Sequence, residues 1–302
     1  MDYKFIQVKK IADSVTLLHN DRLTTFELTY PRLIHSELMT HRVFSRNAQS
    51  SRAIPTPKRI ARILEDPVVP LVLYKNQKGM QAKSEEVDKP IFTKDTWIAA
   101  ARASADAADI LYNTCNLHKQ WSSRGLEPYD TITTIVTATD FENFFALRCA
   151  DDAQPEICRL AWLMADEYYA GTKPVPVVVG HWHLPYIETV RIQAITEYHK
   201  ANPHLKLSWD DIAIRSSIAC CARVSYLNHD GSNIDIEKDL GLYAMLKSSM
   251  HMSPFEHVAT PSLQMERTSN FKGWTQYRKL LDKEVLTFNY EEALKTRQEY
   301  TK

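Results

Sequence analysis

Segments with the two-residue period of a β-strand alternate along this chain with segments that have the 3.6-residue period of a helix. Residues 24–30 alternate apolar and polar side chains up to Pro31, and the β-branched run 131–139 indicates a second strand. Helices are predicted at 95–112, 151–169, 188–200, 209–226 and 235–250. This order of elements favours an α/β (α+β) fold in which helices flank a mixed sheet.

Glycine is scarce, which limits how a nucleotide could be bound. Only seven glycines occur, and none forms a GxGxxG or GxxxxGK loop. Rossmann and P-loop sites need such loops because their backbone must approach phosphates closely. Any nucleotide bound by this chain would therefore be held mainly by side chains.

The composition is that of an ordinary globular protein. The chain has 302 residues, 44% hydrophobic residues and a formal net charge of zero. We expect a single catalytic domain over 1–302, with segments 1–170 and 216–302 joined by a proline-rich connector at 171–215. The zero net charge gives no general attraction to nucleic acid or to an acidic membrane.

Cellular location and redox state follow from two further features. The five cysteines are odd in number and form no CxxC pair, which indicates reduced thiols and argues against a disulfide framework or a zinc site. The first ten residues do not have the pattern of a secretory signal, and no apolar run is long enough to span a bilayer. We therefore predict a cytoplasmic protein that does not associate with membranes.

Residues 40–52, THRVFSRNAQSSR, concentrate three arginines and a histidine among small polar side chains, with no carboxylate. Arginine matches phosphate oxygens bidentately, and Ser50, Ser51 and Asn47 could complete an anion site. A surface loop that pairs with carboxylates elsewhere is an equally good interpretation of the composition.

Two other segments carry candidate residues. In NFFALRCADDAQPEI (143–157), Arg148 ends an apolar run, so its stem should be buried and its head should need an acceptor, for which Asp151, Asp152 or Glu156 are available. CCARVSY (220–226) and HMSPFEH (251–257) offer His257 beside a carboxylate and an aromatic residue. Each segment alone is a weak indication of a site.

Taken together, these segments resemble the flavin-dependent thymidylate synthases. HRVFSRNAQSSR is similar to that family's RHRxxSxNxxSxR motif, NFFALRCADDAQPEI to its LR…AQxEI segment, and CARVSY and SPFEH to its ARVS and PFEH segments. In the family, the last two segments come first. The chain therefore resembles a circularly permuted member, which is plausible where termini lie close together.

The resemblance implies an enzyme that methylates dUMP at C5, with methylenetetrahydrofolate as carbon donor and NADPH-reduced FAD as redox carrier. It places His41, Arg42, Asn47, Asn143 and His257 at the flavin. It places Ser50, Ser51, Arg52 and Arg124 at the nucleotide, and Arg148 at the pyrimidine as the catalytic residue. It also implies a homo-oligomer, a tetramer in the family, and a small-molecule nucleotide substrate.

Several positions depart from the family pattern. Thr40 stands where the first arginine of RHR is usual, Ala48 where glutamate is usual, and Ala53 where tyrosine is usual. Glu37 stands where glutamine often lies beside the nucleotide. An ionised carboxylate only accepts hydrogen bonds, so dCMP, with its exocyclic amine, is an alternative substrate, and a hydroxymethyl product is an alternative outcome. Pairing of Glu37 with His41 is an equally good interpretation.

Two other functional classes are open to the sequence. Phe44 and Trp121 could stack bases in a nucleic-acid-binding protein, although the neutral net charge and the lack of a basic stripe argue against it. His181 and His183 of GHWH could begin a metal site, but no third ligand is evident nearby. We therefore predict neither nucleic acid nor metal as a partner.

Overall fold

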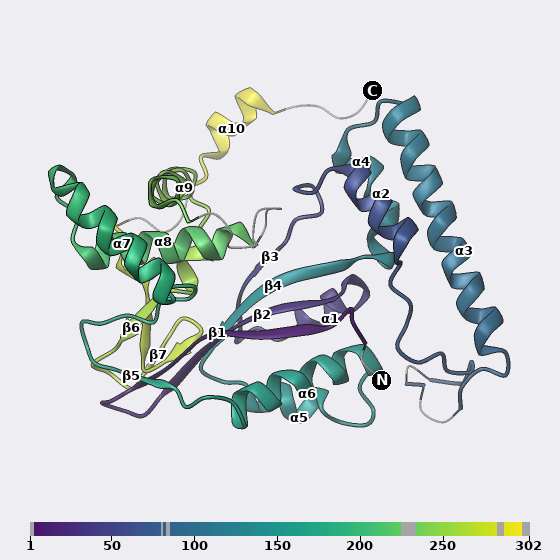
Figure 1. The fold of residues 1–302 in the computed structure, drawn as a ribbon, viewed down its shortest axis with the longest axis horizontal. Helices are drawn as coiled ribbons and strands as arrows, with labels where there is room; N and C mark the ends of the chain where they lie inside the picture. Colours follow the sequence, from purple (N-terminus) through teal and green to yellow (C-terminus); the bar gives the residue numbers. More distant parts are fainter. Residues whose placement is uncertain (1–2, 80, 83–84, 225–233, 283–286, 298–302) are drawn as a thin grey trace.

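The computed structural model describes the chain apart from residues 1–2, 80, 83–84, 225–233, 283–286 and 298–302. At its centre is a five-stranded mixed sheet with the strand order β3-β4-β2-β1-β5 (Figure 1). Its strands are β1 (Gln7–Thr16), β2 (Arg22–Pro31), β3 (Ser45–Ala48), β4 (Thr131–Ala138) and β5 (Val175–Val177). β5 runs parallel to β1, and the other neighbouring strands are antiparallel. The predicted mixed sheet and both predicted strands are confirmed.

Side chains alternate between the two faces of a strand, so the two faces of β4 pack against different groups of helices. Ile132 and Val136 lie in the core formed with α5 (Glu142–Arg148) and α6 (Pro155–Tyr169), which cover the lower face in Figure 1. Ile135 points the other way and packs against Cys221 and Val224. The sheet therefore separates two hydrophobic cores.

On the second face lie α7 (Thr189–Ala201), α8 (Trp209–Arg223) and α9 (Ile236–Ser248), close to the ranges predicted for them. Ser208 and Asp211 form a capping box that fixes the start of α8. Residues 225 and 226 of the predicted 209–226 helix lie outside the described residues. Near these helices are three short elements: η5 (Ser253–Glu256), β6 (Ala259–Pro261) and β9 (Trp274–Gln276).

A third group of helices covers one end of the sheet. α3 (Pro90–Asp109) confirms the helix predicted at 95–112 and begins five residues earlier. It packs on α2 (Thr56–Glu65) and η3 (Arg124–Tyr129) through a small cluster of isoleucine, leucine and alanine side chains. α2 was not predicted, because the prolines of AIPTPK indicated irregular structure. Pro57 instead lies at its first turn, where proline is tolerated.

Part of the connector predicted at 171–215 belongs to the sheet. Ser14, Val15 and Thr16 of β1 pair with Val175–Val177. The prolines do not prevent this, because a proline can lie on an edge strand. The remaining short elements are η1 (Arg32–Ile34), α1 (His35–Leu38), η2 (Ile110–Thr114), α4 (Lys119–Ser122), η4 (Pro203–Leu205), β7 (Arg267–Thr268), β8 (Phe271–Lys272), η6 (Tyr277–Leu280) and α10 (Tyr290–Thr296).

The cysteines and the helix lengths bear on two of the compositional expectations. All five cysteines are free thiols. Within the described part of the chain, none of the helices combines the length and the apolar character needed to cross a bilayer.

Candidate active site

The arginine-rich segment 40–52 is laid out along the edge strand β3, and the alternation of the strand divides its contacts. Asn47 points toward α8 and η5: its Nδ2 donates to the carbonyl of Cys221 (2.8 Å), and its Oδ1 accepts from Ser253 Oγ (3.3 Å). Arg46 points away from these elements and donates to the carbonyl of Met39, just after α1. β3 therefore lies between the C-terminal motifs and α1.

Three segments that are far apart in sequence meet at Asn47. Cys221 belongs to the CCARVSY segment, Ser253 opens SPFEH, and Asn47 itself belongs to the arginine-rich segment. Ser225 and Tyr226 of CCARVSY lie outside the described residues. Cys221 lies in the last turn of α8, where carbonyls lack an intrahelical donor. The Asn47 amide supplies that donor, so the contact has a structural cause as well as a position in the candidate site.

On the other side of β3, Arg148 joins two of the predicted residues. Arg148 ends α5; its Nε donates to His41 Nε2 (3.0 Å), and its Nη1 lies 3.6 Å from the Glu37 carboxylate. The expectation that its head needs an acceptor holds, but the acceptors come from α1 and the residues that follow it. Among the described residues, neither Asp151 nor Asp152 forms an ion pair with it, and Glu156 accepts from the Leu71 amide at 2.7 Å.

His41 is held neutral in this arrangement. Its ring is buried, stacks on Phe44 and meets the edge of Phe144. Burial first, and then the charges of Arg148 and Arg46, lower the pKa of His41 to about 4. A neutral imidazole that accepts at Nε2 carries its proton on Nδ1. His41 therefore positions the Arg148 head, while Glu37 supplies the ion pair.

A second cluster forms around Glu127 in η3. Its carboxylate accepts from Arg124 Nη1 (2.9 Å), lies 3.4 Å from Arg32 Nε and bonds the Ser51 side chain. Burial alone would raise the pKa of Glu127, but the Ser51 hydroxyl, Arg32 and Arg124 lower it below its usual value. The structure thus brings Ser51 and Arg124, both predicted at the nucleotide, onto one carboxylate.

His35 and Arg46 connect the two clusters. His35 Nδ1 bonds the hydroxyl of Tyr30 (2.8 Å). Burial and the charges of Arg32 and Arg46 lower its pKa to about 4, while Glu127 opposes this shift. Arg46 also acts on the pKa of His41, so it lies within electrostatic reach of both histidines.

Four residues of these clusters were missing from the sequence prediction: Arg32, His35, Arg46 and Glu127. Arg46 was visible as the third basic residue of the 40–52 segment. Glu127 follows Arg124 by three residues, the spacing of a helical ion pair. The positions of Arg32 and His35 depend on tertiary packing, so no local pattern indicated them.

Other predicted residues lie at the surface. Arg42 and Arg52 are exposed, and Asn143 is exposed in the first turn of α5. Ser50 is partly buried, and its Oγ accepts from the backbone amide of Arg52 (3.3 Å). Arg42, Arg52 and Asn143 form no side-chain hydrogen bond to another described residue, so the fold leaves their polar groups available to a ligand.

His257 is enclosed and belongs to a buried hydrogen-bond chain. Along it, Ser14 Oγ bonds His183 Nδ1, His183 Nε2 bonds Thr25 Oγ1, Thr25 Oγ1 bonds Thr137 Oγ1, and Thr137 Oγ1 bonds His257 Nδ1, each at 2.8 Å. The chain crosses β1, β2 and β4. Burial lowers the pKa of both histidines to about 3, so both are neutral. His257 Nε2 has no hydrogen-bond partner among the described residues.

The donor set bears on which groups could be bound. Arg42 and Asn143 are exposed donors suited to the phosphates and the polar ring edge of a flavin dinucleotide, so this part of the site fits FAD. His257 does not fit a direct flavin contact in this chain, because its side chain is fully buried. Within the described residues, no group of three or more His, Cys, Asp or Glu side chains is arranged to hold a metal ion. His183 is bonded to Ser14 and Thr25.

Comparison with known proteins identifies the class to which this arrangement belongs. Residues 22–171 match the model of the family Thy1, described as thymidylate synthase complementing protein. The match covers just under half of the chain and includes the arginine-rich segment, Arg124 and Arg148. No curated protein sequence matches.

Some solved structures overlap part of the chain. The flavin-dependent thymidylate synthase ThyX from Helicobacter pylori, complexed with FAD and dUMP, is 20% identical over 48% of this chain and 67% of its own, with a TM-score of 0.35. The UMP/dUMP methylase PolB from Streptomyces cacaoi, bound to 5-Br UMP, is 15% identical over 55% and 89%, with a TM-score of 0.44. Both overlaps cover only part of this chain.

The family match is therefore the decisive comparison, and it agrees with the resemblance drawn from the motifs. Residues 22–171 are therefore similar to the Thy1 family, and this similarity supports an enzyme of the thymidylate synthase class. The match stops before CCARVSY and SPFEH, so the order of those segments relative to the family stays a prediction.

Proposed function

We propose that this protein methylates dUMP at C5, with methylenetetrahydrofolate as carbon donor and NADPH-reduced FAD as redox carrier. The observation that carries the proposal is the group formed by Arg148, His41 and Glu37 beside the arginine-rich strand β3. This strand also bonds the two C-terminal segments through Asn47.

Arg148 is the residue placed to act on the pyrimidine. His41 holds its Nε, and Glu37 lies beside Nη1, so the planar head is oriented while its remaining N–H groups can bind a ring carbonyl. A fixed cation beside that carbonyl stabilises the enolate-like negative charge on the ring that makes C5 nucleophilic. His41 stays neutral and does not compete for this charge.

The phosphate end of the nucleotide belongs at the other cluster. Ser50, Ser51, Arg52 and Arg124 provide hydroxyl and guanidinium donors at the end of the arginine-rich segment and in η3. In the structure, Glu127 accepts from two of these residues. A nucleotide phosphate would take over donors that this carboxylate now uses.

Cofactor positions follow from the exposed donors. A bound reduced flavin would supply the reducing equivalents, and the folate would supply the carbon unit. Arg42 and Asn143 would hold the flavin, and Asn47 would fix β3 against α8 beneath it. We further propose a homo-oligomer, a tetramer by analogy with the family, acting as a cytoplasmic enzyme.

dCMP is the second candidate substrate, and Glu37 is the observation that favours it. Its carboxylate lies 3.6 Å from Arg148 rather than on His41, so an acceptor stands at the pyrimidine end of the site. A carboxylate can accept from the exocyclic amine of cytosine. Glu37→Gln tests this preference, because the amide can both donate and accept.

The proposed activity is tested with purified full-length protein, FAD, NADPH and methylenetetrahydrofolate, offered dUMP or dCMP. We expect a yellow protein whose flavin bands bleach with NADPH. With dUMP, we expect a product in which a methyl group replaces a hydrogen, so that its mass exceeds that of dUMP by one CH2. A hydroxymethyl product, or turnover of dCMP alone, would replace the leading proposal with the alternative. Absence of turnover with both nucleotides would contradict both.

Arg148→Ala tests the assignment of the pyrimidine contact. We expect a loss of turnover of at least about 100-fold, because removal of a positioned charge-stabilising group costs that much, while flavin binding is retained. Turnover is measured by product mass and flavin content by absorbance. Arg102→Ala is the matched control, since Arg102 is an exposed arginine on α3, and it should keep full activity. An active Arg148→Ala variant would show that another residue contacts the pyrimidine.

A further inference from the structure

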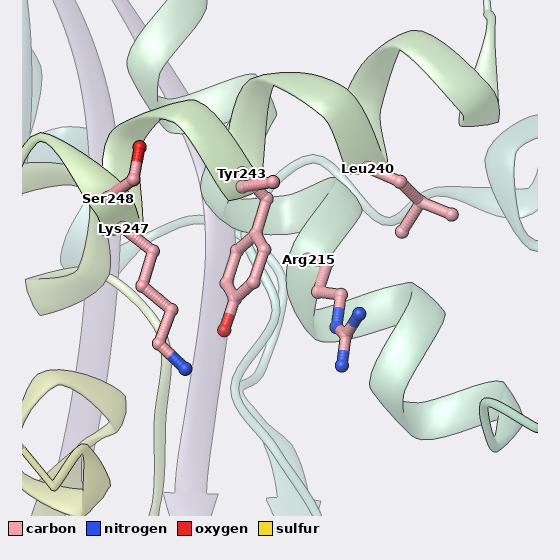
Figure 2. Close-up of a pocket in the computed structure, with 6 residues that line it drawn as sticks. Arg215, Leu240, Tyr243, Lys247 and Ser248 are labelled. Carbon is pink, nitrogen blue, oxygen red and sulfur yellow. The ribbon is translucent and has the colours of Figure 1, made fainter.

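A cavity of about 460 Å³ opens between α8 and α9, and none of its lining residues belongs to the candidate active site. It is lined by Arg215, Leu240, Tyr243, Ala244, Lys247 and Ser248. Figure 2 shows the Arg215 head, the Tyr243 hydroxyl and the Lys247 ammonium pointing toward the same region. Its size lies in the range of pockets that bind small molecules, which is roughly 300–1,000 Å³.

Both cations of this cavity lack an ion-pair partner among the described residues. Neither Arg215 nor Lys247 forms an ion pair with a carboxylate of the described residues, and Arg215 Nε is buried without a hydrogen-bond partner there. Asp211 lies one turn before Arg215 on α8 and within its electrostatic reach, but its carboxylate is hydrogen-bonded to Ser208 in the capping box (2.7 and 3.0 Å). The Arg215 head therefore has donors that no carboxylate of the described residues pairs with, and an anion in the cavity could accept from them.

The rest of the lining is aromatic and aliphatic. The Arg215 guanidinium lies over the Tyr243 ring, 5.2 Å from its centroid, and Leu240 and Ala244 extend the apolar wall along α9. The Tyr243 hydroxyl is 3.0 Å from that of Tyr277, so the ring is anchored. A ligand that filled this cavity would combine a negative group for the two cations with a flat apolar body for this wall.

We propose that this cavity is a binding site for a small phosphate monoester with an aromatic body. Two separate cations suit a dianion better than a single carboxylate, and the arginine fork matches phosphate oxygens bidentately. The chain as a whole carries no net charge, so the attraction is local to this site. Arg215 lies six residues before Cys221, about 9 Å along α8, so occupancy here does not require any residue of the candidate active site.

The test uses phenyl phosphate, titrated into the full-length protein by calorimetry at about 100 mM salt, where long-range surface attraction is screened. Arg52→Ala is the background for all variants, because it removes a phosphate donor at the candidate active site. We expect phenyl phosphate to bind at least about tenfold more tightly than either phenol or inorganic phosphate. Each of these probes supplies only half of the proposed contacts.

Arg215→Gln and Lys247→Met should each raise the Kd for phenyl phosphate by about tenfold or more, since each removes a charge-assisted contact. Lys238→Met is the matched control: Lys238 is an exposed lysine on the same helix, paired with Asp235 at 2.9 Å, and its removal should leave the Kd unchanged. Melting temperatures verify that the variants fold. If Arg215→Gln does not, Arg215→Lys should fold and bind with intermediate affinity.

Three outcomes would overturn the proposal. The first is no measurable binding of phenyl phosphate. The second is a Kd for phenyl phosphate that is the same in the Arg215→Gln and Lys247→Met variants as in the background protein. The third is inorganic phosphate binding as tightly as phenyl phosphate, which would leave an anion site without a role for Tyr243.

Discussion

At the scale of single residues, Glu127 is the side chain whose position has the clearest functional consequence. It satisfies Ser51, Arg124 and Arg32 in the absence of substrate, and these are donors that a nucleotide phosphate would need. A carboxylate in this position offsets the repulsion between the two guanidinium groups. It also compensates part of the free-energy cost of removing them from water. Under the proposed function, Glu127 competes with the nucleotide for the same donors.

Glu127→Gln should therefore strengthen nucleotide binding. A neutral amide attracts Arg124 and Arg32 less than a carboxylate does, so the donors are released at lower cost. We expect KM for the nucleotide to fall by about three- to tenfold, with kcat unchanged. Steady-state kinetics at two salt concentrations measure this effect. An increase in KM would show that Glu127 holds the donors in their productive arrangement.

Arg148 shows how far a sequence pattern reaches at this scale. Its position after an apolar run predicted a buried stem and a head that needs acceptors; the side chain is partly buried, and its head has acceptors. The acceptors nearest in sequence were Asp151, Asp152 and Glu156, whereas the contact with His41 spans 107 residues. Local spacing predicts that a charge must be satisfied; the path of the chain decides which group satisfies it.

At the scale of elements, the short strand β3 connects the two parts of the site, because it lies between α8 and η5 on one side and α1 on the other. Its backbone pairs with β4 over four residues, Ser45 to Ala48. On one side, Asn47 caps the end of α8 and reaches η5; on the other, Arg46 reaches the residues after α1. A strand with so few backbone hydrogen bonds depends on these side-chain contacts for its position.

Asn47→Ala should loosen this connection and destabilise the protein by about 1–3 kcal/mol, because the Cys221 carbonyl loses its donor and two hydrogen bonds disappear. Urea unfolding measures the free energy of unfolding and its m-value. Asn113→Ala is the control, an exposed asparagine bonded only within its own turn, and it should change stability by less than about 0.5 kcal/mol. Equal effects of both variants would mean that Asn47 is not a structural connection.

Elements with strong periodicity were predictable, and short or edge elements were not. The period of the apolar residues predicted several elements correctly: the strands at 24–30 and 131–139 and the helices α3, α6, α7 and α9. α2 was missed because the prolines beside it indicated a break, and β5 because only three residues pair with β1. β3 was missed because its polar residues are bonded to other elements and show no apolar alternation.

At the scale of the whole molecule, histidines with lowered pKa values make stability depend on pH; His35 and His41 contribute, and the enclosed His183 and His257 have the largest shifts. Burial lowers the pKa of His183 and His257 to about 3, against about 6.5 for an unfolded histidine. Between these values the unfolded chain binds protons that the folded chain does not, so lowering the pH favours unfolding. We expect stability to fall below about pH 6.5, by up to about 1.4 kcal/mol per pH unit for each imidazole.

Urea midpoints measured from pH 7.5 to 4.5 test this expectation. His204→Gln serves as the control, because His204 is exposed and its removal should leave the slope unchanged. Constant stability over this range would show that the two enclosed histidines keep their proton affinity on folding.

The buried chain from Ser14 to His257 has only two self-consistent proton arrangements when both imidazoles are neutral and every link is made. If His183 donates from Nδ1 to Ser14, both threonine hydroxyls must donate toward His183, and His257 donates from Nδ1 and presents a bare Nε2. If Ser14 donates to His183 instead, donor and acceptor exchange roles in every hydrogen bond of the chain, and His257 Nε2 carries a hydrogen. The tautomer of His183 thus determines the tautomer of His257 through a chain that crosses three strands. A Ser14→Ala substitution would therefore shift the tautomer equilibrium of His257 although Ser14 does not contact it.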